Sequence, residues 1–132
     1  MAAALARAGA DIVLLARRAS ALQETAGSLQ ALGVKADVVV ADLSDESKLP
    51  EIGLQLTKQF ADLAIVVNAA GVNLREPFEQ VTPESWRMQL CLHLSVPFFL
   101  TQAIAPGMQK QGYGRIINIA SLQSWRAFAN SA

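Results

Sequence analysis

Four groups of polar residues in this chain each follow an apolar run that is typical of a buried strand. They are Arg17 with Arg18, then Asp42, then segment 68–71 (Asn-Ala-Ala-Gly), and finally Ser121. Parallel strands bring their carboxyl ends to one edge of a sheet, where open α/β folds bind ligands. A carboxylate there can accept a hydrogen bond from an adenine amino group, and a guanidinium can pair with phosphate or stack on a flat base. The pattern therefore favours a nucleotide site at that edge.

Each of these groups also has a plainer structural explanation. Arg17 and Arg18 could be a solvated pair at the start of a helix, and Asp42 could cap the helix that follows it. Gly71 could serve a tight turn through its backbone freedom alone. Because all the groups are expected at one sheet edge, their convergence is stronger support for a site than any single motif.

The elements that would position these residues alternate along the chain. Helices are expected to start at the caps Ser20, Ser44 or Asp45, and Thr82, and Gly9 and Gly33 end two of them. We predict strands over residues 11–16, 36–41, 63–68 and 115–120, and helices over 1–8, 20–32, 44–60 and 82–108. Strands that alternate with crossover helices predict a parallel sheet covered by helices on both faces.

Composition excludes several classes of function. The 132 residues are 52% hydrophobic and 17% charged, and eleven basic residues balance eleven acidic ones, so no basic surface for nucleic acid is expected. The apolar runs are too short to span a bilayer and the first residues do not resemble a signal peptide, so we expect a cytoplasmic protein without a membrane partner. Cys91 is single, so the sequence has no disulfide framework and no zinc-ligand spacing, and a core position is the simpler interpretation. We expect no metal site.

Several segments together resemble the short-chain dehydrogenase/reductase family. Segment 68–71 is similar to its Asn-Asn-Ala-Gly signature, segment 41–45 to its adenine-contacting Asp segment, and segment 114–121 to the strand that delivers its catalytic serine. Further matches in order and spacing are Trp86, Pro97-Phe98, Gln102-Ala103 and Pro106-Gly107-Met108. The resemblance covers essentially the whole chain and does not select a substrate.

The resemblance implies a doubly wound parallel sheet of the Rossmann-like, three-layer α/β/α type, with residues 1–132 as a partial NAD(P)-binding domain. It also implies an oxidoreductase that transfers a hydride between a nicotinamide cofactor and the carbonyl or alcohol of a small molecule, in a protein that forms homo-oligomers. The family's Gly-rich turn would precede Met1 and its Tyr-x-x-x-Lys motif would follow Ala132. We therefore expect a chain truncated at both ends.

The resemblance also implies a cofactor site. Asp42 would contact adenine, with Leu43 beside the ring. The ribose region would be lined by Asn68, Ala69 and Gly71, and Ile119 joins the cofactor-binding set. Position 16, which is often acidic in members that prefer NAD, is Ala16, and Arg17 follows it. A guanidinium without that carboxylate favours NADP, although NAD remains possible.

For catalysis, the resemblance implies that Ser121 binds the substrate oxygen. His93 occupies the place where the family often has an Asn that holds a water; the other interpretation is a partly buried helix histidine. The one tyrosine, Tyr113, has Ile117 four residues on instead of Lys. A six-residue strand would separate Tyr113 from Ser121 by roughly 20 Å, so Tyr113 cannot replace the family's proton donor. We expect a polypeptide of these residues alone to be inactive.

Two other functions are compatible with the same residues. One is a nucleotide-binding module without catalysis, and the other is a different doubly wound domain, such as a flavodoxin-like one, that binds another phosphate ligand or a protein. The substrate cannot be inferred from these residues. Trp125, Arg126 and Phe128 are candidates to contact it, or they cover the sheet edge. The last residues, up to Ala132, are expected to form a loop or to lead into another helix.

Overall fold

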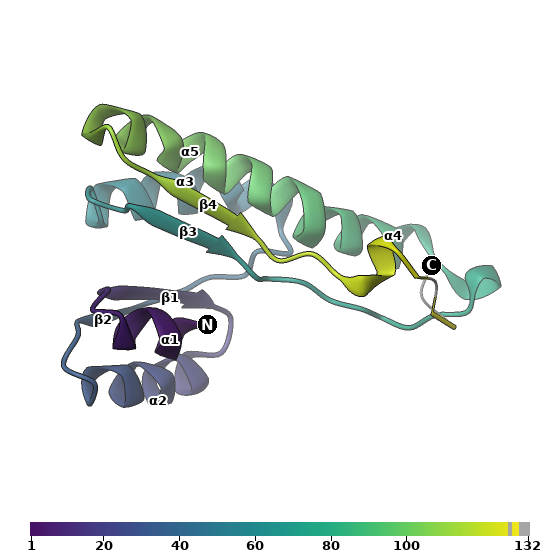
Figure 1. Ribbon diagram of the computed structural model, residues 1–132. Helices are drawn as coiled ribbons and strands as arrows, with labels where there is room; N and C mark the ends of the chain where they lie inside the picture. The colour runs from purple at the N-terminus through teal and green to yellow at the C-terminus, as the bar shows by residue number, and fades with distance from the viewer. Residues whose placement is uncertain (127, 130–132) are drawn as a thin grey trace. The chain divides into compact units, whose positions relative to one another are not determined.

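The computed structural model describes residues 1–126, 128 and 129, in which helices alternate with parallel strands (Figure 1). The chain divides into two compact units, residues 1–42 and 43–132, and each is described here by itself. The last residues, up to Ala132, for which we predict a loop or the approach to a helix, lie partly outside the described residues. The predicted α/β class with parallel strands is confirmed.

The first unit is a parallel strand pair with two helices. In chain order its elements are α1 (Ala2–Arg7), β1 (Ile12–Ala16), α2 (Ala19–Gln30) and β2 (Ala36–Val40). The strands pair in register from Ile12 opposite Ala36 to Ala16 opposite Val40. The backbone N–H of Lys35 donates to the Asp11 carboxylate over 2.8 Å, and Ile12 N–H donates to the Lys35 carbonyl over 2.9 Å. These two bonds fix the register where both strands begin.

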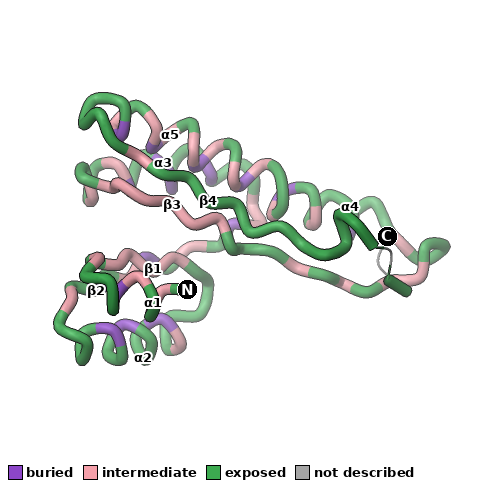
Figure 2. Tube along the Cα trace, in the orientation of Figure 1, coloured by how far each residue is buried: buried purple, intermediate pink, exposed green. Residues whose placement is uncertain are grey.

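The core of this unit is small and made mostly of alanine and leucine side chains. Its buried members are Ala6, Ala26, Leu29 and Ala36. Figure 2 shows buried stretches along α2. Leu22, Ala26 and Leu29 form the buried face of α2, as the sequence predicts. Gly9 and Gly33 have φ angles of +90° and +87°, the left-handed conformation that ends a helix and that glycine adopts most readily.

The predicted N-cap of α2 is wrong by two residues. Arg18, not Ser20, is the N-cap residue, and the first helical bond runs from Leu22 N–H to the Arg18 carbonyl over 3.1 Å. Arg18 keeps an extended backbone, with φ −94° and ψ 99°, so the chain turns into the helix directly after it. The Ser20 hydroxyl therefore lies inside the first turn, beyond the position where a side chain caps the helix.

The second unit holds the other strand pair and the long helices. Its elements are η1 (Glu46–Lys48), α3 (Leu49–Gln59), β3 (Ile65–Asn68), η2 (Phe78–Gln80), α4 (Pro83–Leu90), η3 (Cys91–Ser95), α5 (Val96–Gln111), β4 (Arg115–Asn118) and η4 (Leu122–Ser124). The η3 segment is a π-helix, and the other η segments are 3₁₀ helices. β3 and β4 pair in parallel from Ile65 opposite Arg115 to Asn68 opposite Asn118.

Helices α3 and α5 form the main packing contact of this unit. Every fourth residue of α5 is buried, and α3 buries a matching set; the two sets are Val96, Leu100, Ile104 and Met108, and Leu49, Ile52, Gly53 and Leu56. A Cβ atom on Gly53 would lie 2.6 Å from the Cβ of Ala103, so the glycine lets the two backbones approach closely. This packing holds α5 beside β3.

The sequence signals for the starts of the two long helices are confirmed. The Asp45 carboxylate accepts from the backbone N–H of Ser47 over 3.2 Å and caps η1, which leads into α3. Thr82 and Ser85 form a capping box, each side chain accepting from the other residue's backbone N–H over 3.1 Å. Pro83 at the first helical position fits this start because its missing N–H needs no partner there.

The continuous helical run from α4 through α5 corrects one expectation. Pro83–Gln111 is long and apolar enough to cross a membrane by length and composition, so the prediction that the apolar runs are too short to span a bilayer is wrong by this criterion. Core helices of soluble proteins, which are mostly buried, pass the same test; α5 packs a buried stripe against α3, although only 22% of the apolar window of this run is buried. The run is therefore weak support for a membrane span.

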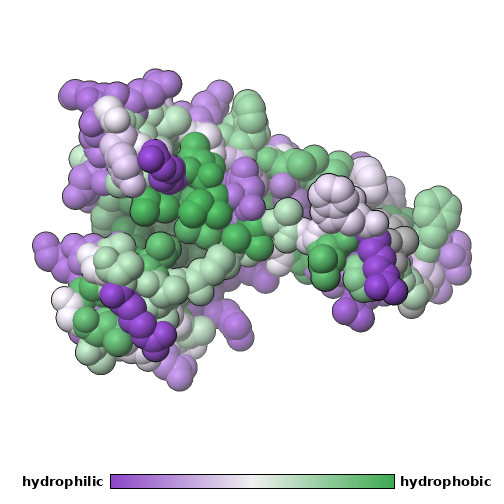
Figure 3. All heavy atoms as spheres, in the orientation of Figure 1, coloured by the Kyte–Doolittle hydropathy of each residue, from purple (hydrophilic) through white to green (hydrophobic). Residues whose placement is uncertain are grey.

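The strands are less covered than the sequence predicts. Within the described residues they form two separate pairs, β1 with β2 and β3 with β4. All four residues of β4 are exposed, and β3 is only half-buried, because α5 is the helix that packs on this pair. Figure 3 shows apolar side chains gathered over β3 and β4 on this face. The expected cover on both faces is thus missing for this pair in the described chain.

Candidate active site

Two asparagines meet at the carboxyl ends of β3 and β4. Asn68 and Asn118 stand opposite each other as the last residues of the paired strands, and the Asn68 side-chain amide donates to the Asn118 side-chain oxygen over 2.8 Å. The ladder continues one step further, with Ile119 N–H donating to the Asn68 carbonyl over 3.0 Å. This pairing leaves one amide oxygen, on Asn68, and one NH₂ group, on Asn118, to face a ligand.

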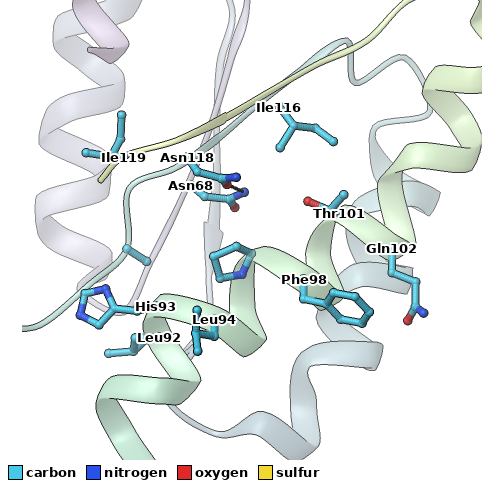
Figure 4. Close-up of a pocket in the computed structure, with 12 residues that line it drawn as sticks. Asn68, Leu92, His93, Leu94, Phe98, Thr101, Gln102, Ile116, Asn118 and Ile119 are labelled. Atoms are coloured by element: carbon cyan, nitrogen blue, oxygen red, sulfur yellow. Dashed lines mark hydrogen bonds between the residues drawn. The ribbon is translucent and has the colours of Figure 1, made fainter. Parts of the chain in front are cut away.

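A cavity of about 560 Å³ opens beside this amide pair. On one side are the ends of β3 and β4, and on the other are η3 and the first turns of α5 (Figure 4). The lining residues are Asn68, Ala70, Leu92, His93, Leu94, Pro97, Phe98, Thr101, Gln102, Ile116, Asn118 and Ile119. An apolar wall with a few convergent polar groups is the usual composition of a small-molecule site. The cavity is large enough for part of a cofactor or a small substrate.

The loop after β3 passes directly against His93. The ring nitrogen Nε2 lies 2.8 Å from the carbonyl oxygen of Val72 and 3.4 Å from its backbone nitrogen. A Cβ atom on Gly71 would lie only 2.7 Å from Cε1 of the same ring. Among the described glycines, positive φ occurs at Gly9, Gly33 and Gly112, so Gly71 is required here by close contact and not by its backbone angle. His93 is exposed, which does not fit the alternative interpretation of a partly buried helix histidine.

Ser121 follows the same strand end as Asn118. It is exposed, and its Oγ accepts from the backbone N–H of Gln123 over 3.2 Å as the cap of η4. Tyr113 lies at the opposite end of β4, where the Arg115 guanidinium stacks on its ring at 4.7 Å from the centroid. The structure therefore agrees with the expectation that Tyr113 and Ser121 are separated by the length of the strand.

The predicted adenine-side residues belong to the ends of β1 and β2 in the first unit. Ala16 and Val40 are paired, and Ala41 N–H donates to the Ala16 carbonyl over 3.1 Å, so Arg17 and Asp42 follow neighbouring strand ends. Both are exposed. The sequence prediction that the two groups share an edge is met within this unit.

Leu43 and Cys91 are both buried in the second unit. The Cys91 thiol donates to the Leu43 carbonyl over 3.4 Å. Cys91 is 5% exposed and Leu43 is 7% exposed. The expectation that Cys91 is a small core residue is confirmed. The predicted role of Leu43 beside an adenine ring stays a prediction, and the side chain itself is packed inside the protein.

The structure brings together only part of the predicted site. Asn68, His93 and Ile119 line one cavity, and Ala69 and Gly71 lie on the exposed loop beside it. Sequence reasoning missed Asn118 and the helix residues that form the cavity wall: Leu94, Phe98, Thr101 and Gln102. Pairing the two predicted strands, 63–68 and 115–120, by their ends places Ala120 opposite Asn68, so the register that brings Asn118 there could not be found from the sequence.

Charge plays a small part near this cavity. The clearest electrostatic effect is at Asp45, where a hydrogen bond from the Ser47 side chain, helped by Lys48, lowers the pKa of the carboxyl group. Asp45 caps η1 and does not line the cavity. Within the described part of the chain, no group of three or more His, Cys, Asp or Glu side chains could hold a metal ion.

Comparison with known proteins identifies the family. The model of the short chain dehydrogenase family matches residues 1–132. Gluconate 5-dehydrogenase of Gluconobacter oxydans is 32% identical over 94% of this chain and 48% of its own length. The 2-dehydro-3-deoxy-D-gluconate 5-dehydrogenase of Bacillus subtilis is 36% identical over 96% of this chain and 49% of its own length.

Solved structures agree with this match. A metagenomic short-chain oxidoreductase in complex with NADP superimposes with a TM-score of 0.90 at 30% identity, covering 99% of this chain and 60% of that one. The bulky-bulky ketone specific alcohol dehydrogenase of Comamonas testosteroni gives 0.83 at 30% identity, covering 92% and 49%. The chain therefore belongs to the short-chain dehydrogenase family. It spans about half the length of the curated relatives named here.

Proposed function

We propose that the protein is an oxidoreductase that transfers a hydride between NADP(H) and the carbonyl or alcohol group of a small molecule. The observation that carries the proposal is the amide-lined cavity at the ends of β3 and β4, in a chain that matches the dehydrogenase family over its whole length. We also propose that residues 1–132 form part of one NAD(P)-binding domain, which the continuous family match supports.

The residues at the end of β3 fit a nicotinamide cofactor. Ala69, Ala70 and Gly71 are exposed and carry at most a methyl group, so a bulky ligand can approach their backbone closely. Asn68 and Asn118 offer an acceptor and a donor to ribose hydroxyl groups. When bound, NADP(H) would supply or accept the hydride, and these residues would bind and orient it.

Two observations support NADP over NAD. Ala16 cannot repel a 2′-phosphate, and Arg17 beside it can pair with one. In addition, one of the similar solved structures is described as a complex with NADP. Asp42, which follows the neighbouring strand, would contact the adenine, and its exposure leaves it accessible.

For the substrate, we propose that the Ser121 hydroxyl binds the reacting oxygen. Ser121 follows shortly after Asn118, the last residue of β4, and so comes just beyond the paired ends of β3 and β4. The hydroxyl accepts one bond from the Gln123 backbone N–H and donates to the Gln123 side-chain oxygen over 3.4 Å, a long contact that the reacting oxygen of a bound substrate would replace. A donor at that oxygen stabilises the charge that develops there during reduction.

The test uses the complete protein, however far it extends beyond these residues. NADPH or NADH is mixed with ketones, aldehydes and keto acids, including the oxidation products of gluconate suggested by two relatives' names, and nicotinamide absorbance is followed. We expect substrate-dependent oxidation, faster with NADPH. Tight NADPH binding with no turnover on any compound would instead favour the non-catalytic nucleotide-binding module.

A further inference from the structure

We propose that Gln123 determines substrate specificity, because its side-chain amide can bind a hydroxyl group on the carbon next to the reacting carbonyl. The preferred substrates are then ketones or aldehydes that carry such a neighbouring hydroxyl group. The inference rests on the proposed function, since it takes the Ser121 hydroxyl as the group that binds the reacting oxygen. It deepens that function by naming a substrate class, which the sequence leaves open.

The Gln123 side chain lies at the hydroxyl group that would bind the substrate. Its Oε1 is 3.4 Å from Ser121 Oγ, and the backbone N–H of the same residue donates to that Oγ over 3.2 Å. Both contacts come from residue 123, so the amide group and the hydroxyl group occupy one small region of the chain. A substrate that reaches the hydroxyl group therefore also meets the amide.

The backbone of the turn holds Gln123 in this place. Ser124 N–H donates to the Ser121 carbonyl over 3.1 Å, and Trp125 N–H donates to the Leu122 carbonyl over 3.0 Å. These bonds form η4, which follows the end of β4 in Figure 1. The position of Gln123 is thus set by the fold, while its exposed side chain remains free to rotate.

The contact between the amide and the hydroxyl group is weak enough for a substrate to replace it. An O–H···O hydrogen bond is usually about 2.5–3.0 Å long, and the contact between Ser121 Oγ and Gln123 Oε1 is longer, at 3.4 Å. A carbonyl oxygen that takes the Ser121 proton displaces Oε1, because both oxygens are acceptors for the same proton. Rotation about the last side-chain bond then turns the NH₂ group of Gln123 towards the substrate.

The chemistry of the amide favours a neutral hydroxyl group over a charged group. Within the described part of the chain, the NH₂ group of Gln123 has no hydrogen-bond partner. An amide offers a donor and an acceptor, and a hydroxyl group can use both, whereas a carboxylate only accepts and is matched better by a guanidinium group. Because the amide stands beside the reacting oxygen, the hydroxyl group within its reach is the one on the adjacent carbon.

The Gln123→Met variant tests this role, because methionine keeps a flexible side chain of similar length and removes the amide. The two probes are hydroxyacetone and butanone, which differ by a hydroxyl group in place of a methyl group on the carbon next to the carbonyl. Reduction of either ketone consumes one NADPH and one proton and forms an alcohol. The ratio of kcat/KM for the two ketones is compared between the wild type and the variant, which cancels their difference in intrinsic reactivity.

We expect Gln123→Met in the complete protein to lower the preference for hydroxyacetone over butanone by about three- to tenfold, the effect of one lost hydrogen bond. The kcat/KM for butanone should stay within about twofold of the wild type. Ser124→Ala, in the same turn, should leave the preference unchanged. Equal losses on both ketones in Gln123→Met would overturn the proposal, because a residue that only supports the turn affects both alike. An unchanged preference would overturn it as well.

A second measurement does not depend on turnover. In the ¹⁵N-labelled complete protein with NADP⁺ bound, the side-chain NH₂ signal of Gln123 is assigned by its loss in Gln123→Met. We expect hydroxyacetone to shift this signal and butanone to leave it in place. The same shift with both ketones, or no shift with hydroxyacetone, would overturn the proposal. Absence of turnover in the wild type would count against the proposed function, and the amide signal would still decide this inference.

Discussion

At the scale of single residues, the candidate site depends on a loop with small side chains held between two strand ends and a helix. Gly71 is the tightest point of this loop, because a Cβ atom added there would lie 2.7 Å from Cε1 of His93. From the sequence, Gly71 could serve a tight turn through its backbone freedom. Its φ angle is not positive, so the backbone conformation does not require glycine there. The contact makes the two residues dependent on each other, and this dependence can be measured.

We expect Gly71→Ala to lower the free energy of unfolding by about 1–3 kcal/mol, the usual cost of overpacking. In a His93→Ala background the ring is absent, so the same change should cost much less. Gly27→Ala is the matched control: an added Cβ there meets nothing within 4 Å, and the helical position should gain about 0.5–1 kcal/mol. Urea unfolding of the wild type, the two single variants, the double variant and the control measures these values. An equal cost of Gly71→Ala in both backgrounds would show that the ring contact is unimportant.

A second residue-scale prediction concerns the cofactor. Arg17→Ala should weaken NADPH binding by about tenfold or more, the loss expected for a charge-assisted bond, and leave NADH binding nearly unchanged. Arg18→Ala is the control, because Arg18 is the N-cap residue of α2 and has the same charge one position later. Dissociation constants for both cofactors give the ratio directly. Equal losses for NADPH and NADH in Arg17→Ala would contradict the predicted NADP preference.

At the scale of elements, the packing of α3 on α5 holds the helix that forms one wall of the cavity. Gly53→Ala should lower the free energy of unfolding by about 1–2 kcal/mol, because overpacking outweighs the gain in helix propensity. Ala103→Gly in the same protein removes the opposing methyl group and should reduce the loss from Gly53→Ala. Thermal unfolding of the single and double variants tests this. A neutral or stabilising Gly53→Ala would mean that the two helices do not approach as described.

Most elements could be predicted from the sequence, because their signals are local. Thr82 with Pro83 marks the start of α4, and Gly9 and Gly33 mark the ends of helices. The π-helix η3 could not be predicted, since one inserted residue changes neither the composition nor the apolar pattern of a long helix. The contact between His93 and Val72 joins residues far apart in the sequence, so no local pattern contains it.

At the scale of the whole molecule, exposed apolar side chains are numerous. Ile116, Ile117 and Ile119 along and after β4 are 41–50% exposed, and Phe98 on α5 is 61% exposed. Side chains of this kind lose much of their hydrophobic stabilisation when they stay in water. The described chain therefore has a small core for its size.

We expect a polypeptide of these 132 residues alone to be poorly stable or to need a partner. Differential scanning calorimetry, with sedimentation to establish that the sample is monomeric, checks this. A cooperative transition of the monomer well above room temperature would contradict it.

The same polypeptide should also fail to oxidise NADPH with any carbonyl compound, because Tyr113 stands at the wrong end of β4. Turnover that disappears in Tyr113→Phe would show that this site assignment is wrong.

The most direct test of the proposed site is the Ser121→Ala variant of the complete protein, measured for both kcat and NADPH affinity. Removing a hydroxyl that donates to the reacting oxygen should lower kcat by about 10²–10³-fold. The dissociation constant for NADPH should stay near that of the wild type, since the variant leaves Asn68 and the loop intact. Ser124→Ala, in the same short helix η4, should keep near-normal kcat and controls for local disturbance. Near-normal turnover in Ser121→Ala would contradict the proposed active site at the ends of β3 and β4.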